Sequence, residues 1–287
     1  MGTVLLNGQF VAASGAAVSV FDGGFLHGAG LFETMRAENG RIFRLDSHLT
    51  RLCNSAGKLL QPLERPDLPA QDQFRELLDR NGLREARVRL TVTAGPMREG
   101  IDSGDQGRTI CVTASPLVAY PAAMYQRGVS VVICQCRQSA ADPTAGHKTT
   151  AYLPRLLGLR HAHAAGCQEA LWFTHQNRLA EGCISNVFVV REGRLRTPPL
   201  DTPVLPGIAR GVVLQLAAQE GIPFDETPLH IHDLLDADEV FLTNTIMQVI
   251  PVVRVEKHDI GGRRVGPLVP RLLAVFRRLV GEECGIR

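Results

Sequence analysis

Residues 147–166 read HKTTAYLPRLLGLRHAHAAG, and the lysine of this run is its most informative residue. Lys148 follows a loop rich in small residues (139–146) and precedes a helix that the spacing predicts from about residue 151 to 165. A lysine held between apolar elements loses hydration, which favours the neutral, nucleophilic amine needed for Schiff-base chemistry. A solvated loop lysine is the alternative, and position alone favours that alternative.

Short strands and helices alternate irregularly on both sides of this run. Before it, two hairpins are expected to turn at Asn7-Gly8 and Asn39-Gly40, a dipeptide typical of tight β-turns. Asp46 or Ser47 could cap the helix that follows the second hairpin. The remaining expected elements are a helix near 71–82, strands at 87–95, 108–115, 129–134, 185–190 and 239–244, a hairpin at 169–182 and a helix at 208–220. This pattern predicts an α+β (mixed α/β) fold rather than a regular doubly wound sheet.

The chain is long enough for two domains. It has 287 residues, and domains usually contain about 100–200 residues. The segment SPLVAYPAAMYQRG (115–128) has two prolines between strand-rich blocks, which is typical of a linker. We expect an N-terminal α/β domain at 1–117, a linker at 118–123 and a larger C-terminal cofactor-binding domain at 124–287.

Composition excludes several classes of protein. The 31 Lys and Arg residues are interleaved with 29 Asp and Glu residues, so no nucleic acid or anionic membrane partner is expected. No apolar run is long enough to span a bilayer, and the first residues lack the basic start of a signal peptide, so the cytoplasm is the expected location. Seven scattered cysteines without a C-x-x-C pair predict neither disulfides nor a zinc site. Small molecules or a second copy of the chain remain as partners.

Two histidine pairs are the candidates for metal ligands. His161 and His163, like His230 and His232, are two residues apart, which on a helix places the rings on opposite sides. No metal site is therefore expected. A Ser–His–Asp hydrolase is not expected either, because the sequence has no G-x-S-x-G nucleophile elbow.

Four further features supply the groups that a pyridoxal phosphate site needs beside an amine. Glu181 lies in LAEGCISNVF at the mouth of a hairpin, where its carboxylate can face a ligand. Arg51 lies on the flank of the first long helix, and its planar fork suits a phosphate. Gly207 and Ile208 stand at a helix N-terminus, and the turn at 243–245 adds hydroxyl and N–H groups. Together these residues provide an acid and a phosphate-binding cup.

Six runs along the chain carry a resemblance to a known family. They are FDGGFLHGAGLFETMR (21–36), RIFRLDSHLTRL (41–52), HKTTAYLPRLLGLRHAHAAG (147–166), RLAEGCISNVFVV (178–190), DTPVLPGIARGVV (201–213) and EVFLTNTIMQVIPV (239–252). In order and spacing they resemble the pyridoxal phosphate-dependent class IV aminotransferases of fold type IV, over roughly residues 3–280. That family contains branched-chain and D-amino acid aminotransferases, (R)-selective amine transaminases and 4-amino-4-deoxychorismate lyases. The resemblance implies two domains with the cofactor in the cleft between them, and a homodimer.

The resemblance also implies roles for single residues. Lys148 forms the Schiff base with the cofactor and later moves the proton at the substrate Cα. Glu181 faces the pyridine nitrogen and keeps it protonated, so that the ring acts as an electron sink. Phosphate contacts are implied for the side chains of Arg51 and Thr245 and for the N–H groups of Ile208 and Ala209.

Two more residues are implied near the cofactor. Tyr152 falls where several members place a tyrosine near the phenolic oxygen of the ring, although a half-buried structural tyrosine fits its position equally well. Asn186, in the Ser-Asn pair, orders the backbone near the cofactor rather than reacting. The presence of both Lys148 and Glu181 argues against a non-catalytic descendant that only binds a ligand.

The residues expected at the substrate depart from the branched-chain pattern. His27 stands in FLHGAG where branched-chain enzymes often have tyrosine, and Ala29 replaces the aspartate of the commoner GDG. Arg36 in ETMR and Arg98 in TAGPMREG are the arginines that could bind a substrate carboxylate. For Arg98, a solvated loop arginine is the alternative.

Two reactions stay open for this chain. The leading one is transfer of an amino group between a small amino acid or amine and a 2-oxo acid, because transaminases dominate the family. The alternative is 4-amino-4-deoxychorismate lyase, which releases pyruvate and 4-aminobenzoate. It is kept because TNTIM (243–247) looks more like the lyases.

Overall fold

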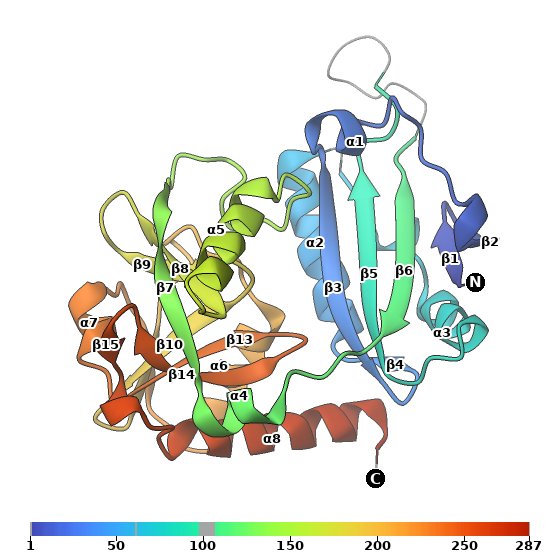
Figure 1. Cartoon of the computed structure of the whole chain (residues 1–287). Coiled ribbons are helices and arrows are strands. Elements are labelled where there is room, and N and C mark those ends of the chain that lie inside the picture. Colours follow the sequence, from blue (N-terminus) through green and yellow to red (C-terminus); the bar gives the residue numbers. More distant parts are fainter. Residues whose placement is uncertain (1, 61, 98–106, 287) are drawn as a thin grey trace. The chain divides into compact units, whose positions relative to one another are not determined.

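The computed structural model of the chain describes residues 2–60, 62–97 and 107–286, which form two compact units (Figure 1). The first unit contains Met1–Val118, His147–Tyr152 and Val280–Arg287, and the second contains Ala119–Gly146 and Leu153–Leu279. Two segments from later in the chain therefore belong to the first unit. The domain boundaries expected from the sequence, which follow chain order, do not include them.

The first unit is built on a six-stranded antiparallel sheet with the order β2-β1-β6-β5-β3-β4. Its strands are β1 (Thr3–Leu6), β2 (Gln9–Ala12), β3 (Gly30–Glu38), β4 (Arg41–Ile42), β5 (Ala86–Thr93) and β6 (Ile110–Pro116). Both expected hairpins form. Asn7 and Gly8 have φ of 48° and 79°, and Asn39 and Gly40 have φ of 51° and 72°. These left-handed pairs suit the twist of a tight hairpin.

Two helices cover one face of this sheet. They are α2 (Leu45–Leu59) and α3 (Gln71–Arg80), and their apolar faces pack with Leu31, Met35 and Leu90 of the strands. The predicted caps of α2 are wrong: the residue before the helix is Arg44, with φ of 56°, and no side chain caps the first turn. Because Asp46 already lies inside that turn, its charge can only favour the positive end of the helix dipole.

A short helix, α1 (Gly23–His27), precedes β3 and is held by a buried carboxylate. Asp22 is fully buried and accepts hydrogen bonds from the N–H of Gly24 at 2.7 Å and from the hydroxyls of Thr93 and Thr109 at 2.8 and 2.7 Å. These three bonds offset the cost of burying the charge. They tie the start of α1 to the end of β5 and to the segment before β6.

The second unit is built on a nine-stranded mixed sheet. The order is β12-β11-β10-β13-β14-β7-β8-β9, with β15 paired to β14, and the β11–β12, β14–β7 and β7–β8 pairs are parallel. Its strands are β7 (Val129–Gln138), β8 (Glu169–Thr174), β9 (Leu179–Gly182), β10 (Asn186–Arg191), β11 (Arg194–Thr197), β12 (Phe224–Glu226), β13 (Glu239–Asn244), β14 (Gln248–Val255) and β15 (His258–Asp259).

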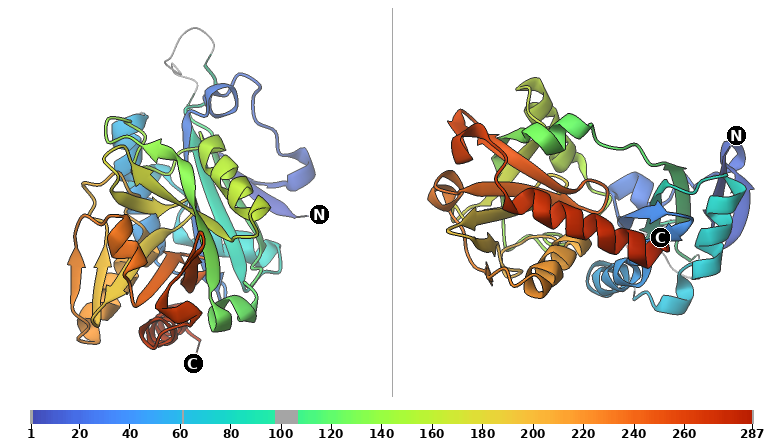
Figure 2. Two further views of the ribbon diagram at one scale, coloured as in Figure 1. Left: turned by 60° about the vertical axis from the view of Figure 1, so that its left-hand side comes forward. Right: turned by 90° about the horizontal axis from the view of Figure 1, so that it is seen from below.

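The helices of the second unit differ in part from the expectation. They are α4 (Ala122–Arg127), α5 (Leu153–Ala164), α6 (Ile208–Gln219), α7 (Ile231–Leu235) and α8 (Leu268–Cys284), of which α8 ends in the first unit from Val280 onward. One 3-10 turn, Gly261–Arg263, also lies in the second unit, and two others, Ala13–Gly15 and Arg65–Asp67, lie in the first. The predicted linker at 118–123 runs into α4, which begins directly after Pro121. The buried Ala162 of α5 belongs to one apolar cluster with Trp172 and Val132 of the sheet. The ribbon of α5 lies along β7 and β8 (Figure 2).

The sequence pattern predicts no element after residue 244, yet the structure contains β14 and the long helix α8 there. Pro251 lies inside β14, and proline is uncommon in a central strand. The strand tolerates it because the pairing with β7 begins only at Val252. Helix α8 is capped by Glu239, whose carboxylate oxygens accept the N–H groups of Leu268 and Val269 at 3.0 Å each.

Within the described part of the chain, no helix has both the length and the apolar character needed to cross a membrane.

Candidate active site

Lys148 is fixed to the start of β3 in the first unit. Its carbonyl accepts the N–H of Phe32 at 2.9 Å, and Thr150 N–H donates to Gly30 at 2.8 Å. The neighbouring His147 contacts the hydroxyl of Ser55 on α2 at 2.8 Å. The segment thus extends the sheet beside β3, where β4 does not reach, and its backbone has little freedom.

The side chain of the half-buried Lys148 lies against aromatic rings. Its Nζ is 4.5 Å from the ring centroid of Phe32 and 5.8 Å from that of Tyr152. The two rings meet edge to face, with centroids 5.3 Å apart. The negative faces of aromatic rings attract an ammonium group. The structure therefore brings Lys148 and Tyr152 together beside Phe32.

Arg89 on β5, which was not predicted as a site residue, shares the Phe32 ring with Lys148. Its guanidinium carbon is 3.8 Å from the ring centroid, and its Nε donates to the Thr91 hydroxyl at 3.1 Å. Burial and the nearby Arg87 lower the pKa of Arg89 from its usual value. The strand alternation of ARVRLTVT shows only that Arg89 lies on the polar face of β5. Its place beside Phe32 depends on the register with β3.

Arg51 lies on α2 and pairs with a buried acid that the sequence analysis missed. Its Nε and Nη2 donate to the two carboxylate oxygens of Glu33 on β3, at 2.8 and 2.5 Å. His48, one helical turn before Arg51, places its Nδ1 2.7 Å from the same carboxylate. Glu33 and His48 are buried, and the Arg51 side chain is 10% exposed. A lone acid among Leu31, Met35 and Ala37 on β3 was the available signal.

Of the three predicted substrate residues, the structure describes His27 and Arg36, and both lie outside the Glu33–Arg51 pair. His27 is exposed at the end of α1. Arg36 is on the face of β3 that carries Phe32, and its Nε is 2.5 Å from the carboxylate of Glu38. Arg98 lies outside the described residues. The structure therefore does not bring the two described residues, His27 and Arg36, together.

Glu181 lies in the second unit at the end of β9. It is 5% exposed, and its Oε1 accepts Nη2 of Arg155 at 2.6 Å and the amide of Gln138 at 3.3 Å. Its Oε2 accepts the N–H of Leu205 at 2.9 Å and the amide of Asn186 at 3.5 Å. Arg155 and Gln138 were not predicted, because they come from α5 and β7, far from Glu181 in sequence. The carboxylate is held in one orientation.

Asn186 connects Glu181 with the start of α6. Its amide also donates to the carbonyl of Leu205 at 2.9 Å. A Cβ on Gly207 would overlap the side-chain oxygen of Asn186, so only glycine fits as the N-cap of α6. The first residues of the helix, Ile208 and Ala209, are thereby placed beside the Glu181 cluster.

Thr245 lies in the turn between β13 and β14, at the same end of the sheet. Thr243 at the end of β13 pairs with Asn186 at the start of β10. The side chain of Asn244 closes the turn, because its oxygen accepts the N–H groups of Ile246 and Met247 at 2.9 and 2.8 Å. Glu181, Asn186 and the Thr245 turn therefore lie together where strands of the second sheet end or begin.

A second buried acid supports this edge. Glu169 accepts the N–H groups of Cys183 and Ile184 at 3.0 and 3.3 Å and the hydroxyl of Ser185 at 3.0 Å. Burial raises the pKa of this carboxyl. These bonds shape the tight turn that separates Glu181 from Asn186.

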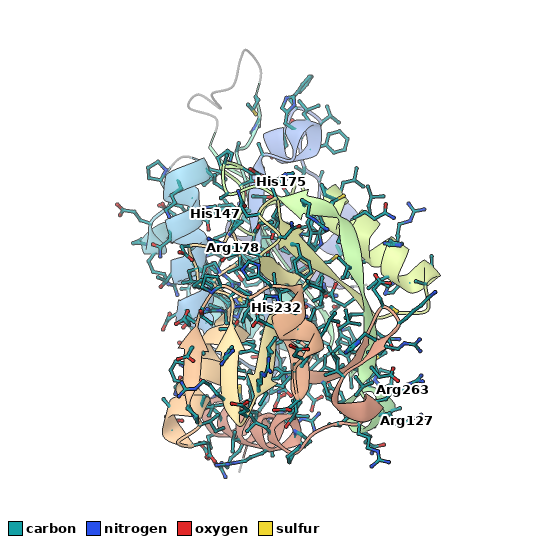
Figure 3. The ribbon with its side chains drawn as sticks, turned by 90° about the vertical axis from the view of Figure 1, so that its left-hand side faces the viewer. Arg127, His147, His175, Arg178, His232 and Arg263 are labelled. Atoms are coloured by element: carbon teal, nitrogen blue, oxygen red, sulfur yellow. The ribbon has the colours of Figure 1, made fainter. Side chains whose placement is uncertain are left out.

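The histidines of the second unit form no candidate metal site. The rings of His230 and His232 were expected on opposite sides of a helix, but this prediction is wrong. They stack with ring centroids 5.7 Å apart, because His230 is the extended N-cap of α7 and not a helical residue. Figure 3 labels His232 on α7 and His175 and Arg178 in the β8–β9 hairpin. Among the described residues, no group of three metal-ligating side chains is close enough to hold a metal ion.

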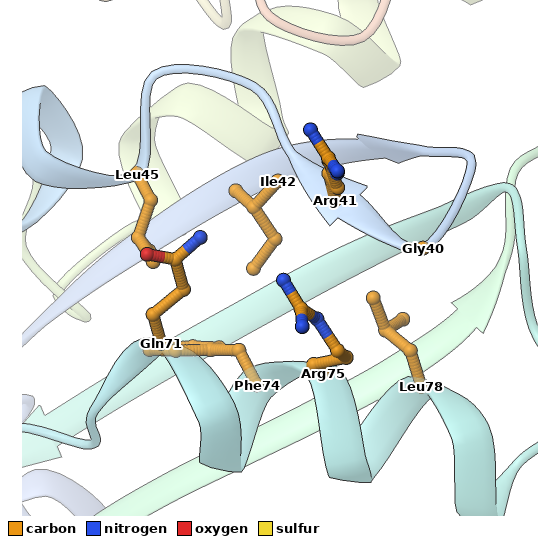
Figure 4. A pocket seen from close by; sticks show the side chains of 8 residues that line it. All are labelled: Gly40, Arg41, Ile42, Leu45, Gln71, Phe74, Arg75 and Leu78. Carbon is orange, nitrogen blue, oxygen red and sulfur yellow. The ribbon is translucent and has the colours of Figure 1, made fainter. Parts of the chain in front are cut away.

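A small hollow of the first unit contains none of the predicted residues. It lies between α3 and the β4 turn and is lined by Gly40, Arg41, Ile42, Leu45, Gln71, Phe74, Arg75 and Leu78 (Figure 4).

Comparison with known proteins identifies the family. The model of the family described as amino-transferase class IV matches residues 30–255. A putative branched-chain-amino-acid aminotransferase of Methanocaldococcus jannaschii is 36% identical over 96% of this chain and 95% of that protein. A D-alanine aminotransferase of Bacillus licheniformis is 32% identical over 98% of both. An aminodeoxychorismate lyase of Bacillus subtilis is 30% identical over 91% of this chain and 89% of that protein.

Solved structures show the same fold. A branched-chain amino acid aminotransferase of T.th. with pyridoxamine 5'-phosphate has a TM-score of 0.89 and 29% identity, over 100% of this chain and 95% of that chain. A second structure of that enzyme contains N-(5'-phosphopyridoxyl)-L-glutamate. These neighbours confirm the predicted α+β fold of type IV. The chain belongs to the class IV aminotransferase family, as the six sequence runs indicated.

Proposed function

We propose that this enzyme is an aminotransferase that moves an amino group between a small amino acid or amine and a 2-oxo acid, with Lys148 as its catalytic base. Its cofactor is pyridoxal 5'-phosphate, because solved neighbours contain pyridoxamine 5'-phosphate or a phosphopyridoxyl adduct. The observation that carries the proposal is the half-buried amine of Lys148, fixed by its backbone to β3 and flanked by Phe32 and Tyr152.

Each unit contains residues that we assign to this cofactor. Arg51, the N–H groups of Ile208 and Ala209 and the hydroxyl of Thr245 would hold its phosphate. The buried carboxylate of Glu181 would face the ring nitrogen, and Tyr152 the phenolic oxygen. Gly207, which no side chain can replace beside Asn186, lets the backbone come close to a ligand. When bound, the cofactor supplies an electron sink that stabilises negative charge at the substrate Cα.

The chain's own residues then have separate tasks. The Nζ of Lys148 would take the proton from the substrate Cα and deliver it to C4′ of the cofactor. Phe32 and Tyr152 keep water from this amine. Glu181 holds the proton of the ring nitrogen, and Arg155 and the Leu205 N–H keep its oxygens in place.

Arg89 is our choice for the group that binds the substrate carboxylate. It shares the Phe32 ring with Lys148, at 3.8 and 4.5 Å respectively, and a guanidinium binds a carboxylate through its planar fork. Arg36, Arg98 and His27 stay predictions for the surroundings of the substrate. Arg89→Met should raise KM for the amino donor more than it lowers kcat, and an unchanged KM would remove Arg89 from the site.

The lyase reaction is the second candidate. The aminodeoxychorismate lyase relative matches nearly the whole chain, and both reactions begin with removal of the Cα proton by the same lysine. A purified sample is given aminodeoxychorismate in one tube and amino donors with 2-oxoglutarate or pyruvate in another. Pyruvate release at catalytic rates, with negligible amination of the keto acids, would reverse our ranking.

A homodimer is the proposed assembly. Three leucines on α5, Leu153, Leu156 and Leu157, are 65%, 48% and 49% exposed, and their spacing puts them on one apolar side of the helix. Analytical ultracentrifugation should show a dimer that Leu156→Glu weakens. A monomer at micromolar concentration would contradict the proposal. The cytoplasmic location remains a prediction.

The central test is chemical labelling. Borohydride treatment of the yellow enzyme should attach the cofactor to Lys148 and to no other lysine, as read by peptide mass. A colourless protein, or a label on Lys58 or Lys257, would defeat the proposed function.

A further inference from the structure

We propose that Glu33 is a positioning residue for the cofactor phosphate: it fixes the guanidinium of Arg51 in the orientation that binds phosphate. This inference rests on the proposed function, because it assumes that Arg51 meets the phosphate.

The geometry of the pair is that of a clamp. Two parallel bonds, from Nε and Nη2 of Arg51 to the two oxygens of Glu33, fix the plane of the guanidinium and not only its distance. Glu33 is 1% exposed on β3, whose backbone is paired with β5 along nearly its whole length, so it cannot follow a moving arginine. The Arg51 side chain is 10% exposed and is thus the more accessible member of the pair. A ligand can meet Arg51 but not Glu33.

His48 completes the clamp from the same helix. Burial, together with the charges of Arg51 and Lys148, lowers the pKa of His48 although Glu33 opposes this. The ring is therefore neutral near pH 7, and its Nδ1 carries the hydrogen that Glu33 accepts at 2.7 Å. Burial raises the pKa of Glu33, but Arg51 and His48 lower it more strongly, to about 2. Glu33 thus stays ionised at every pH at which the enzyme would work.

A buried ion pair is a poor way to stabilise a core. Apolar side chains of similar volume often do as well or better, because removing two charges from water is costly. Glu33 and His48 lie beside Leu31, Met35, Leu49 and Leu52, where an apolar residue would pack readily. A role in function explains the pair better: Glu33 holds Arg51 in the orientation in which it binds a phosphate.

The test separates phosphate recognition from the rest of the cofactor. The apoenzyme is titrated with pyridoxal 5'-phosphate and with pyridoxal, which lacks the phosphate, and binding is followed by the visible band. Glu33→Gln keeps the shape of the side chain but removes the charge. We expect its affinity for pyridoxal 5'-phosphate to fall by about tenfold or more, while that for pyridoxal changes less than about twofold. Inorganic phosphate should compete less well by a similar factor.

Two matched variants are compared. Glu76→Gln removes an exposed acid that pairs with Arg80 through Nε and Nη2, and it should change neither affinity. Arg51→Lys keeps the charge but loses the fork, and it should show the same selective loss as Glu33→Gln. The double variant should lose no more than either single variant, because both changes remove one arrangement.

The outcomes are distinguishable. If the wild-type enzyme is not labelled on Lys148, the proposed function fails whatever Glu33 does. If it is labelled but Glu33→Gln weakens both ligands equally, Glu33 has only a structural role and the inference is overturned. Tighter binding of pyridoxal 5'-phosphate by Glu33→Gln would also overturn it. If Glu33→Gln does not fold by circular dichroism, Glu33→Asp, which keeps the charge but shortens the reach, must show the selective loss instead.

Discussion

Among the described residues, each unit contains one buried carboxylate paired with an arginine, and the two pairs have opposite proposed roles. In the first unit the arginine, Arg51, is the proposed ligand-binding member, and Glu33 supports it from the core. In the second unit the carboxylate, Glu181, is the proposed ligand-binding member, and Arg155 supports it. The chemistry of the two pairs is the same. What differs is which member of the pair we propose to contact the ligand.

The surroundings explain the difference. Glu33 lies on the face of β3 that packs on α2, and its other partner is a neutral histidine. Glu181 lies where β9 ends, and its other partners are two amides and the Leu205 N–H. The first carboxylate is therefore enclosed by apolar side chains. The second is enclosed by hydrogen-bond donors, which hold an oxygen in place without requiring a further charge.

The largest effect is expected from breaking the first pair. Glu33→Ala leaves Arg51 without its partner, and removing one member of a buried pair costs about 3–5 kcal/mol of unfolding free energy. The double variant with Arg51→Met should recover most of that loss. Urea unfolding of the apoenzyme measures both. A single variant as stable as the wild type would show that the pair is not buried in solution.

Removing the charge of Glu181, in the second pair, should lower turnover. Glu181→Gln should keep the cofactor but lose kcat by about 100-fold, the usual loss when a group that stabilises transition-state charge is removed. Gln138→Leu, which removes an uncharged partner of Glu181, should lose much less. Steady-state rates at saturating cofactor decide this. Unchanged turnover in Glu181→Gln would refute its role.

Removing the supporting arginine of the second pair should cost less stability than removing Glu33. Arg155→Gln leaves Glu181 with the Leu205 N–H and the two amides, so we expect a loss of about 1–2 kcal/mol. The measurement is again urea unfolding of the apoenzyme. A loss as large as that of Glu33→Ala would erase the proposed difference between the two regions.

The first pair and its histidine should also make stability depend on pH. The pKa of His48 is lower in the folded protein than its ordinary value of 6.5. As the pH falls, this histidine is therefore protonated in the unfolded chain before it is protonated in the folded protein. The stability that is present above pH 6.5 is lost as the pH falls below that value. Glu33 adds a second loss as the pH falls from 4.5 towards about 2. His48→Gln should flatten the first loss by up to about 1.4 kcal/mol per pH unit. His147, whose pKa burial also lowers, remains in both proteins. Parallel curves for the two proteins would contradict the assignment.

The smallest effect is expected at the surface. The Arg80–Glu76 pair on α3 is about half exposed on both sides, and Glu76→Gln should change the unfolding free energy by less than about 0.5 kcal/mol. This variant calibrates the others, because its arginine also donates through two nitrogens.

Several parts of the fold could be predicted because they depend on neighbours in the chain. The Asn-Gly turns need two left-handed residues, and that dipeptide supplies them at 7–8 and 39–40. Helix α3 follows from apolar spacing. The elements that were missed have non-local causes. Strand β14 contains a proline that is tolerated only because of where β7 begins to pair, and α8 is capped by Glu239, which lies on another strand.

The candidate site divides in the same way. The sequence by itself determined the family, the lysine proposed as catalytic and the acid at the end of its hairpin, because short runs such as HKTT and EGCISN carry that information locally. Only the tertiary structure decided that Arg51 pairs with Glu33, Arg155 with Glu181, and Arg89 with the Phe32 ring. Those partners depend on strand register and on the rotation of a helix over a sheet. Each is set by the packing of the whole core and not by spacing along the chain.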